Sequence, residues 1–223
     1  TGVSNSSHGV ATFNSQTNTI TFTPDTGYNG PAAFNYAITD GRGGAATATA
    51  SLSINPASSS TVSLFNPNST PAITSVADPK SVELGFKFRA SNDGQITGIR
   101  FYKSAQDVGQ HVADLWTASG TLLATATFTN ETASGWQQVE FASPVAINAN
   151  TTYVASYHSP GNYAADPGLF NNSVTNGPLT APSSSSIGGN GVYAYGGSSL
   201  FPTSSYNSTS YGVDVLFRAQ LAA

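Results

Sequence analysis

The chain has 223 residues, enough for one large β-sandwich or one and a half ordinary domains. Charged residues make up 8% of it, against about 25% in an average soluble protein. With a net charge of −4 and only 7 Lys and Arg, the chain lacks the clustered cations that nucleic-acid binding requires. No apolar run approaches the roughly 20 residues of a membrane-spanning helix. We therefore expect no nucleic-acid partner and no membrane insertion.

Uncharged polar residues must supply most of the surface. Ser, Thr, Asn and Gly favour turns and strand edges, and their side chains compete with the helical backbone, so we expect an all-β protein without a long helix. Cysteine is absent, which excludes disulfides, thiolate catalysis and cysteine-type zinc sites. The absence of cysteine fits either a cytosolic protein or a bacterial exported protein that avoids disulfides. The low-charge surface rich in Thr, Ser and Asn favours the second, so the predicted location is secreted or cell surface.

The N-terminal part of the chain shows alternating apolar and polar residues. The runs "GVATFN", "NTITFTP", "AAFNYAITD" and "ATATASLSINP" are separated by the polar turns "SQTN", "DTGYNGP" and "DGRGG". This pattern predicts a four-stranded β-meander or part of a Greek key. The Ser-rich run "ASSST" at residues 57–61 follows Pro56 and predicts a linker.

The alternation is stronger from residue 63 onward. In "SVELGFKFRA", Val82, Leu84, Phe86 and Phe88 share one face, and Glu83 lies on the other, which predicts a half-buried strand. Further strands are predicted in "QITGIRFYKS", in "HVADLWTASGTLLATATF" with a hairpin at Ser119 and Gly120, and in "WQQVEFASPVAI", "TTYVASYHS" and "YGVDVLFRA". Seven or eight strands result.

Residues 159–210 have a different composition, rich in Gly, Pro, Ser, Asn and Tyr. We predict long functional loops, interrupted by a short strand near residues 192–195. Seven aromatic residues fall within 49 residues of this region, interleaved with asparagines. They are Tyr163, Phe170, Tyr193, Tyr195, Phe201, Tyr206 and Tyr211.

The first segment resembles the C-terminal part of the cadherin-like, immunoglobulin-like tandem repeats of bacterial surface proteins. The most specific stretch is "TPDTGYNGPAAFNYAITDG", and the resemblance covers residues 1–56. It implies a partial immunoglobulin-like sandwich, because whole repeats of this kind carry additional N-terminal strands. Four strands alone would leave open edges and an uncovered apolar face.

Residues from about 62 to 217 resemble the bacterial domain of unknown function numbered 4082, which occurs in secreted proteins beside such repeats. The carrying stretches are "VELGFKFRASNDGQITGIRFYK", "GQHVADLWTASGTLLATATFTNETASGWQQVEFASPVAINANTTYVASYH", "GVYAYG" and "YGVDVLF". The resemblance implies a jelly-roll-like antiparallel β-sandwich over residues 62–223 with a presumed glycan-binding role.

Catalytic motifs are missing. None of the three histidines begins an HExxH zinc motif, and no GxSxG nucleophile motif is present. Glycoside hydrolysis needs two carboxylates about 5 to 10 Å apart. The sequence leaves this open, since Asp107, Asp114, Glu131, Glu140 and Asp166 could supply them. We predict that the protein is not an enzyme.

Sugar recognition uses flat aromatic faces and neutral hydrogen-bonding groups, both of which the loop region contains. The predicted ligand-binding residues are Tyr163, Tyr193, Tyr195, Phe201, Tyr206 and His158. The alternative is that these aromatic residues fasten the long loops to the sandwich, and that the histidine makes an ordinary hydrogen bond.

Carbohydrate modules with a jelly-roll fold often hold a structural calcium ion where the terminal strands meet, so the resemblance also raises the possibility of Ca²⁺. Glu83 and Asp214 lie opposite the apolar faces of their strands, and Asp78 precedes the first of them. These three carboxylates are the predicted metal ligands, the alternative being that they are simply solvated.

Two functions follow from this sequence. The first is a non-catalytic module that binds polysaccharide or a cell-surface glycan. The second is a structural stalk or fibre subunit of a bacterial adhesin, in which open strand edges of the first segment pair with neighbouring subunits.

Overall fold

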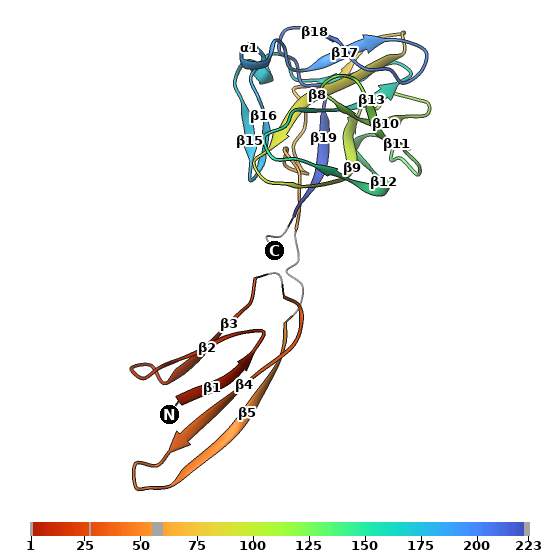
Figure 1. Ribbon diagram of the computed structural model, residues 1–223. Coiled ribbons are helices and arrows are strands. Elements are labelled where there is room, and N and C mark those ends of the chain that lie inside the picture. The colour runs from red at the N-terminus through yellow and green to blue at the C-terminus, as the bar shows by residue number, and fades with distance from the viewer. Residues whose placement is uncertain (1, 27, 55–59, 221–223) are drawn as a thin grey trace. The chain divides into compact units, whose positions relative to one another are not determined.

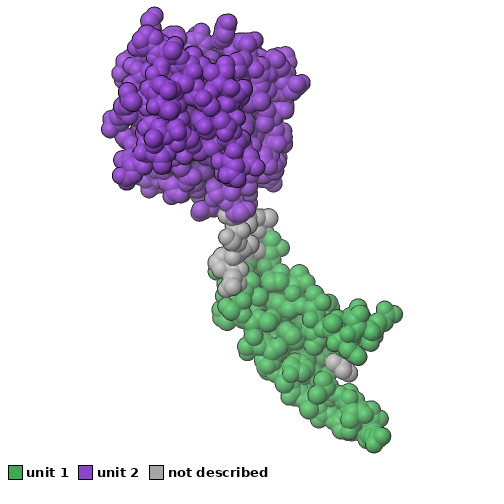
Figure 2. Space-filling model, turned by 180° about the vertical axis from the view of Figure 1, so that it is seen from behind, with its two compact units in different colours: residues 1–58, 221–223 green, residues 59–220 purple. Residues whose placement is uncertain are grey.

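The computed structural model describes residues 2–26, 28–54 and 60–220. They form two compact units, one within residues 2–54 and the other over residues 60–220 (Figure 2). Residues 57–59 of the predicted linker lie outside the described residues, and Thr61 already belongs to a strand of the second unit. The described part of the chain contains no helix long and apolar enough to cross a membrane.

The first unit contains five strands in two antiparallel sheets (Figure 1). One sheet has the order β1-β4-β5 and the other pairs β2 with β3. The predicted four runs correspond to β2–β5, and β1 is additional, because its sequence "GVSNSS" has no apolar alternation and is held by pairing with β4. Their bounds are β1 (Gly2–Ser7), β2 (Gly9–Asn14), β3 (Thr19–Pro24), β4 (Gly30–Thr39) and β5 (Ala45–Ile54).

The second unit is an antiparallel β-sandwich, which confirms the predicted all-β fold class. One sheet contains β11-β10-β13-β8-β16-β15, with β17 also pairing with β8 and with β18. The facing sheet has the order β12-β9-β19-β6, and β14 pairs with β7. The strands are β6 (Thr61–Val62), β7 (Ile73–Val76), β8 (Val82–Ala90), β9 (Gly94–Lys103), β10 (Val112–Thr117), β11 (Leu122–Thr127), β12 (Gly135–Ile147), β13 (Tyr153–Ser159), β14 (Tyr163–Ala165), β15 (Val174–Asn176), β16 (Leu179–Ala181), β17 (Val192–Tyr195), β18 (Ser204–Ser205) and β19 (Val213–Ala219).

The strand number exceeds the seven or eight predicted, because the region 159–210 is more ordered than its composition indicates. It contains five short strands, β14 to β18, a 3₁₀ turn η1 (Leu169–Asn171) and the single-turn helix α1 (Ser184–Ile187). The predicted strand at residues 192–195 is β17, and the predicted hairpin at Ser119 and Gly120 joins β10 to β11. Strands of two to four residues are too short to show a clear periodicity, and β17 is the one of these five that the sequence predicts.

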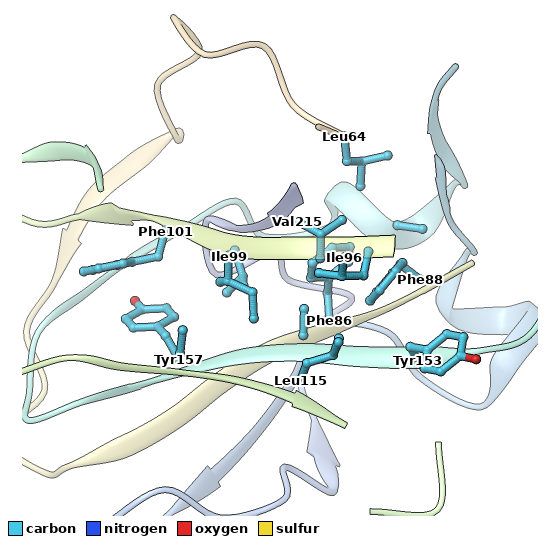
Figure 3. Packing of buried hydrophobic residues seen from close by; sticks show 14 of the residues in the cluster. Leu64, Phe86, Phe88, Ile96, Ile99, Phe101, Leu115, Tyr153, Tyr157 and Val215 are labelled. Carbon is cyan, nitrogen blue, oxygen red and sulfur yellow. The ribbon is translucent and has the colours of Figure 1, made fainter. Parts of the chain in front are cut away.

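The core lies between the two sheets of the second unit. β9 contributes Ile99 and Phe101, both 0% exposed, and β13 contributes Tyr157 from the opposite sheet (Figure 3). The rings of Phe101 and Tyr157 stack with centroids 4.3 Å apart. Buried aromatic pairs of this kind dominate the energetics of a core, since each ring removes a large apolar area from water.

A buried ionic cluster fixes one end of the sandwich. His111 is 0% exposed and lies between two carboxylates, with Nε2 2.9 Å from Asp107 and Nδ1 2.9 Å from Glu131. Lys103 pairs with Glu131 at 2.8 Å. Burial lowers the pKa of His111, but the two carboxylates raise it, and the net pKa lies above its ordinary value. Asp107 and Glu131, two of the carboxylates considered for hydrolysis, are therefore hydrogen-bonding partners of a buried histidine.

Replacing Phe101 by Ala should lower the free energy of unfolding by about 3–5 kcal/mol, because the substitution leaves a cavity between the sheets. Urea unfolding followed by tryptophan fluorescence measures this unit alone, since both tryptophans, Trp116 and Trp136, lie within it. Leu122→Ala, at a side chain 46% exposed, is the control and should change the value by about 0.5 kcal/mol or less. Equal effects of the two substitutions would contradict this assignment of the core.

Candidate ligand-binding site

A pocket lined by tyrosines lies where β17 joins the N-terminal half of β8. The register pairs Val82 with Tyr195 and Leu84 with Tyr193, so all four side chains share one face of the sheet. Val82 and Leu84 are each 1% exposed and form the floor. Tyr163, Tyr206 and Tyr211 complete the lining of a cavity of about 240 Å³.

The tyrosine rings of this pocket pack edge to face. The Tyr193 centroid lies 5.8 Å from that of Tyr195 and 6.3 Å from that of Tyr211, and Tyr211 contacts Tyr163 at 5.7 Å. Tyr211 is buried, whereas Tyr195 is 51% and Tyr206 70% exposed. The inner rings therefore hold the cluster together, and the outer two present aromatic surface to solvent.

Two charged residues lie at the rim of the pocket. The hydroxyl of Tyr195 donates a 2.8 Å hydrogen bond to Asp78, and Lys80 Nζ lies 5.7 Å from the centre of the same ring. The hydrogen bond to Asp78, together with burial, raises the pKa of Tyr195 to about 12. Burial raises the pKa of Tyr163 as well. Both rings are therefore neutral over the physiological range.

Four of the six predicted ligand-binding residues meet in this pocket, namely Tyr163, Tyr193, Tyr195 and Tyr206. The prediction omits Tyr211, although it stands in the same aromatic run, and it omits the floor residues Val82 and Leu84. Only strand pairing reveals that these two apolar residues lie beneath the rings.

Phe201 and His158 lie on the opposite face of the sheet. Phe201 packs against Trp116 with centroids 5.7 Å apart, in a small cluster with Val154 and Val192. His158 Nε2 lies 3.1 Å from the backbone oxygen of Gly196. Both residues attach the segment between β17 and β18 to the outer face of the sheet, so they correspond to the loop-fastening alternative.

The predicted metal ligands are not brought together. Asp214 accepts hydrogen bonds from the backbone N–H groups of Leu64 and Phe65 and pairs with Arg100 at 2.7 Å. The carboxylate oxygens of Asp214 are therefore already used as acceptors. Glu83 lies on β8, in the other sheet. Among the described residues, no group of three or more His, Asp or Glu side chains is placed to hold a metal ion. The three predicted residues do not fit a shared calcium site.

Glu83 was predicted to lie on the solvent side of a half-buried strand. It is instead 0% exposed. The segment between β17 and β18 covers this face, and the carboxyl group lies near the Ser156 hydroxyl and the backbone of Leu200. Within the described chain, neither carboxyl oxygen has a well-aligned hydrogen bond. Burial raises the pKa of Glu83 to about 9, so the group is protonated at neutral pH.

Asp114 is buried on the same face, two strands away, and its pKa is also raised by burial. The remaining carboxylates considered for hydrolysis lie elsewhere. Glu140 is exposed on β12, and Asp166 accepts a 2.5 Å hydrogen bond from the N–H of Ala72. Glu140 and Asp166 therefore lie on separate segments, apart from the two carboxylates that contact His111.

Comparison with known families agrees with this two-unit organisation. The family model described as Domain of unknown function (DUF4082) matches residues 68–213, more than half of the 223-residue chain. The chain belongs to the DUF4082 family. A model described as Cadherin-like domain matches residues 1–55. No curated protein matches the chain.

The matched ranges confirm the predicted arrangement of a cadherin-like segment followed by a DUF4082 domain. The cadherin-like match indicates an adhesion-type repeat. The tyrosine pocket lies within the DUF4082 domain, since all its lining residues fall between Val82 and Tyr211.

Replacing Glu83 by Gln should change the pH dependence of stability. The folded pKa of Glu83, about 9, lies above its ordinary value of 4.5, so the folded state holds an extra proton between these two values. The Glu83 contribution therefore makes the wild-type protein less stable as pH rises from about 4.5 to 9. Relative to wild type, Glu83→Gln should gain melting temperature progressively across this window, as measured by calorimetry.

The matched control is Glu140→Gln, at an exposed carboxylate of the same domain. The melting temperature of this variant should depend on pH in the same way as that of the wild type. A melting temperature of Glu83→Gln that falls further below wild type as pH rises would show that the native carboxylate is ionised and held by a positive partner.

Proposed function

We propose that the DUF4082 domain is a non-catalytic extracellular module that binds glycan through the tyrosine pocket. The observation that carries the proposal is the pair of outward rings, Tyr195 and Tyr206, beside a cavity of about 240 Å³. Ligand pockets commonly enclose about 300–1,000 Å³, so this one suits a single sugar ring rather than a long chain.

The chemistry of the pocket supports a neutral hydroxyl-bearing ligand. The phenol groups act as donors and acceptors, and their faces can cover the apolar C–H surface of a pyranose. Asp78 adds a carboxylate acceptor at the rim and Lys80 adds donors. A rim of this kind can hydrogen-bond hydroxyls on both sides of a stacked ring.

The location and biological setting belong to the same proposal. A disulfide-free chain with 8% charged residues and an adhesion-type repeat suits a secreted or cell-surface protein of bacterial origin. In this setting the module would hold its parent protein on a polysaccharide or on the glycans of a cell surface. Catalysis forms no part of the proposal, since no acid pair lines the tyrosine pocket.

Replacing Tyr195 by Ala should reduce retention on insoluble polysaccharide roughly ten-fold, because one stacking ring and its hydrogen bond are lost. The melting temperature should stay within about 2 °C of wild type, since the ring is 51% exposed. Tyr195→Phe keeps the ring and should retain most of the binding. Pull-down on a panel of insoluble glycans measures this.

Leu122→Ala removes an exposed apolar side chain from the far edge of the same sheet and serves as the control. Unchanged retention of Tyr195→Ala and Tyr206→Ala, separately and together, would count against the tyrosine pocket. Parallel loss of melting temperature and retention would instead indicate a packing role.

The first unit supports a second candidate function, assembly through strand pairing. β5 is ten residues long, pairs with β4 along one side, and stands at the edge of its sheet. Its first five residues are all exposed. Long, uncharged edge strands of this kind can accept a strand from another chain.

If neighbouring chains pair in this way, the molar mass from light scattering should rise with protein concentration. Introducing charge on the edge with Ala46→Lys and Ala48→Lys should abolish the rise, because lysine opposes strand addition. The control is a double lysine substitution at Leu123 and Thr127, two exposed residues of β11. A strictly monomeric wild type at every concentration would contradict the assembly.

A further inference from the structure

A second hollow lies on the outer face of the four-stranded sheet. It is a groove of about 930 Å³, and it shares no lining residue with the tyrosine pocket. One wall is the segment 61–67, and the hairpin turn 175–177 borders it. Arg100, Gln138, Glu140 and Leu216 of the sheet supply the rest of the lining.

The register of the sheet places the lining residues side by side. β12, β9 and β19 place Gln138, Arg100 and Asp214 in one row across the sheet, and Glu140, Gly98 and Leu216 in the next. Gly98 allows close approach of β12, because a Cβ at this position would meet the backbone of Val139 and Glu140. Gln138, Arg100, Glu140 and Leu216 are therefore neighbours on the outer face, whereas the inner face of the same strands is packed into the core.

Arg100 is the buried polar group that borders this groove. It is 5% exposed, and its Nε and Nη2 donate to Asp214 at 3.1 and 2.7 Å. Nη2 also donates to the backbone oxygen of Phe65. Among the described residues no hydrogen bond uses Nη1, which leaves two N–H donors for a ligand in the groove.

The Arg100–Asp214 pair also fixes the wall of the groove. Asp214 accepts the N–H groups of Leu64 and Phe65 at 2.8 and 2.9 Å, so the wall residues are held by the same carboxylate that neutralises Arg100. The donors are thus rigidly placed while the net charge of the pair is zero. Such preorganisation lowers the cost of ordering groups when a ligand binds.

An aromatic cluster lies beside the groove: Phe65 belongs to the groove lining, and Trp136 lines the smaller neighbouring cavity. The guanidinium carbon of Arg100 lies 4.4 Å from the centre of the Trp136 ring, and Phe65 lies 6.3 Å from the same ring. Trp136 Nε1 donates a 2.8 Å hydrogen bond to the backbone of Ser69, which fixes its orientation. Beyond Phe65, a smaller cavity of about 280 Å³ continues along Trp136 and Leu169.

The chemistry of the lining decides the class of ligand. Gln138, Asn66 and Asn176 offer amide groups, Thr61 and Ser63 hydroxyls, and Glu140 an acceptor. The lining contains no cation besides Arg100, which is neutralised by Asp214, so an anionic chain gains no charge partner. The apolar lining residues are Val62, Leu64, Phe65, Pro67 and Leu216, and all but Leu216 lie in the wall formed by segment 61–67. An extended peptide would therefore find apolar side-chain sockets along one side of the groove only.

We propose that this groove binds a neutral oligosaccharide chain of several sugar units, with Arg100 Nη1, Gln138 and Glu140 bonding its hydroxyls and Phe65 contacting one of its rings. This is a second site, separate from the tyrosine pocket, and the two proposals fail independently. Its volume lies near the upper end of the range for ligand pockets, whereas the tyrosine pocket suits one ring.

The test uses the full chain with Trp116→Phe, which leaves Trp136 as the single tryptophan, in a Tyr195→Ala background that weakens the other site. The probes are cellohexaose, xylohexaose and mannohexaose, with hexagalacturonic acid and a Gly-Ser-rich decapeptide as the charged and peptide alternatives. Trp136 fluorescence and isothermal titration calorimetry are both recorded. We expect at least one neutral hexasaccharide to change the fluorescence and to bind in both assays.

Gln138→Ala and Glu140→Ala, both at exposed positions, should each weaken that binding by roughly ten-fold without a change in melting temperature. Gln95→Ala, an exposed glutamine of β9 outside the groove, is the matched control and should have no effect. The proposal is overturned by the absence of calorimetric binding for all three neutral chains, or by binding that ignores both substitutions. Preferential binding of the acidic chain or of the peptide would overturn the assigned ligand class.

Discussion

The structure depends on strand β8, whose two faces and two edges are all occupied. Its inward side chains, Phe86 and Phe88, enter the core, and one edge pairs with β13 along seven residues. The other edge is divided between β17 at its beginning and β16 at its end. The pairing with β17 brings Tyr193 and Tyr195 over Val82 and Leu84, so the tyrosine pocket extends the packing of this strand.

The same strand shows what a sequence pattern can predict and what it cannot. The alternation in "SVELGFKFRA" correctly predicts the inward row, and similar patterns predict the strands that form both sheets. The opposite row was expected beside solvent, yet Glu83 is fully buried. The residues that cover it, between β17 and β18, are more than 110 positions away along the chain, and periodicity within one strand carries no information about such a cover.

Only part of the candidate site was predictable, again because some of its contacts join residues that are far apart in the chain. Composition identified the aromatic run, and four of its tyrosines meet in one pocket. The direction of each ring depends on strand register, so Phe201 could not be separated from Tyr195 by sequence alone. The sequence patterns do not predict the groove. The pair that organises it, Arg100 and Asp214, is separated by 114 residues in the chain. The two residues become neighbours only when β9 pairs with β19.

The scarcity of charge has a consequence for how this protein meets a target. Most hydrogen-bonding groups in both hollows are neutral, Asp78, Lys80, Glu140 and the paired Arg100 being the exceptions, and the chain carries a net charge of only −4. No long-range field draws a partner in, so encounter depends on diffusion and on short-range fit. Screening by ions acts on exposed charges and leaves such contacts almost untouched. The proposed glycan binding should therefore be nearly as strong in concentrated salt as in dilute salt.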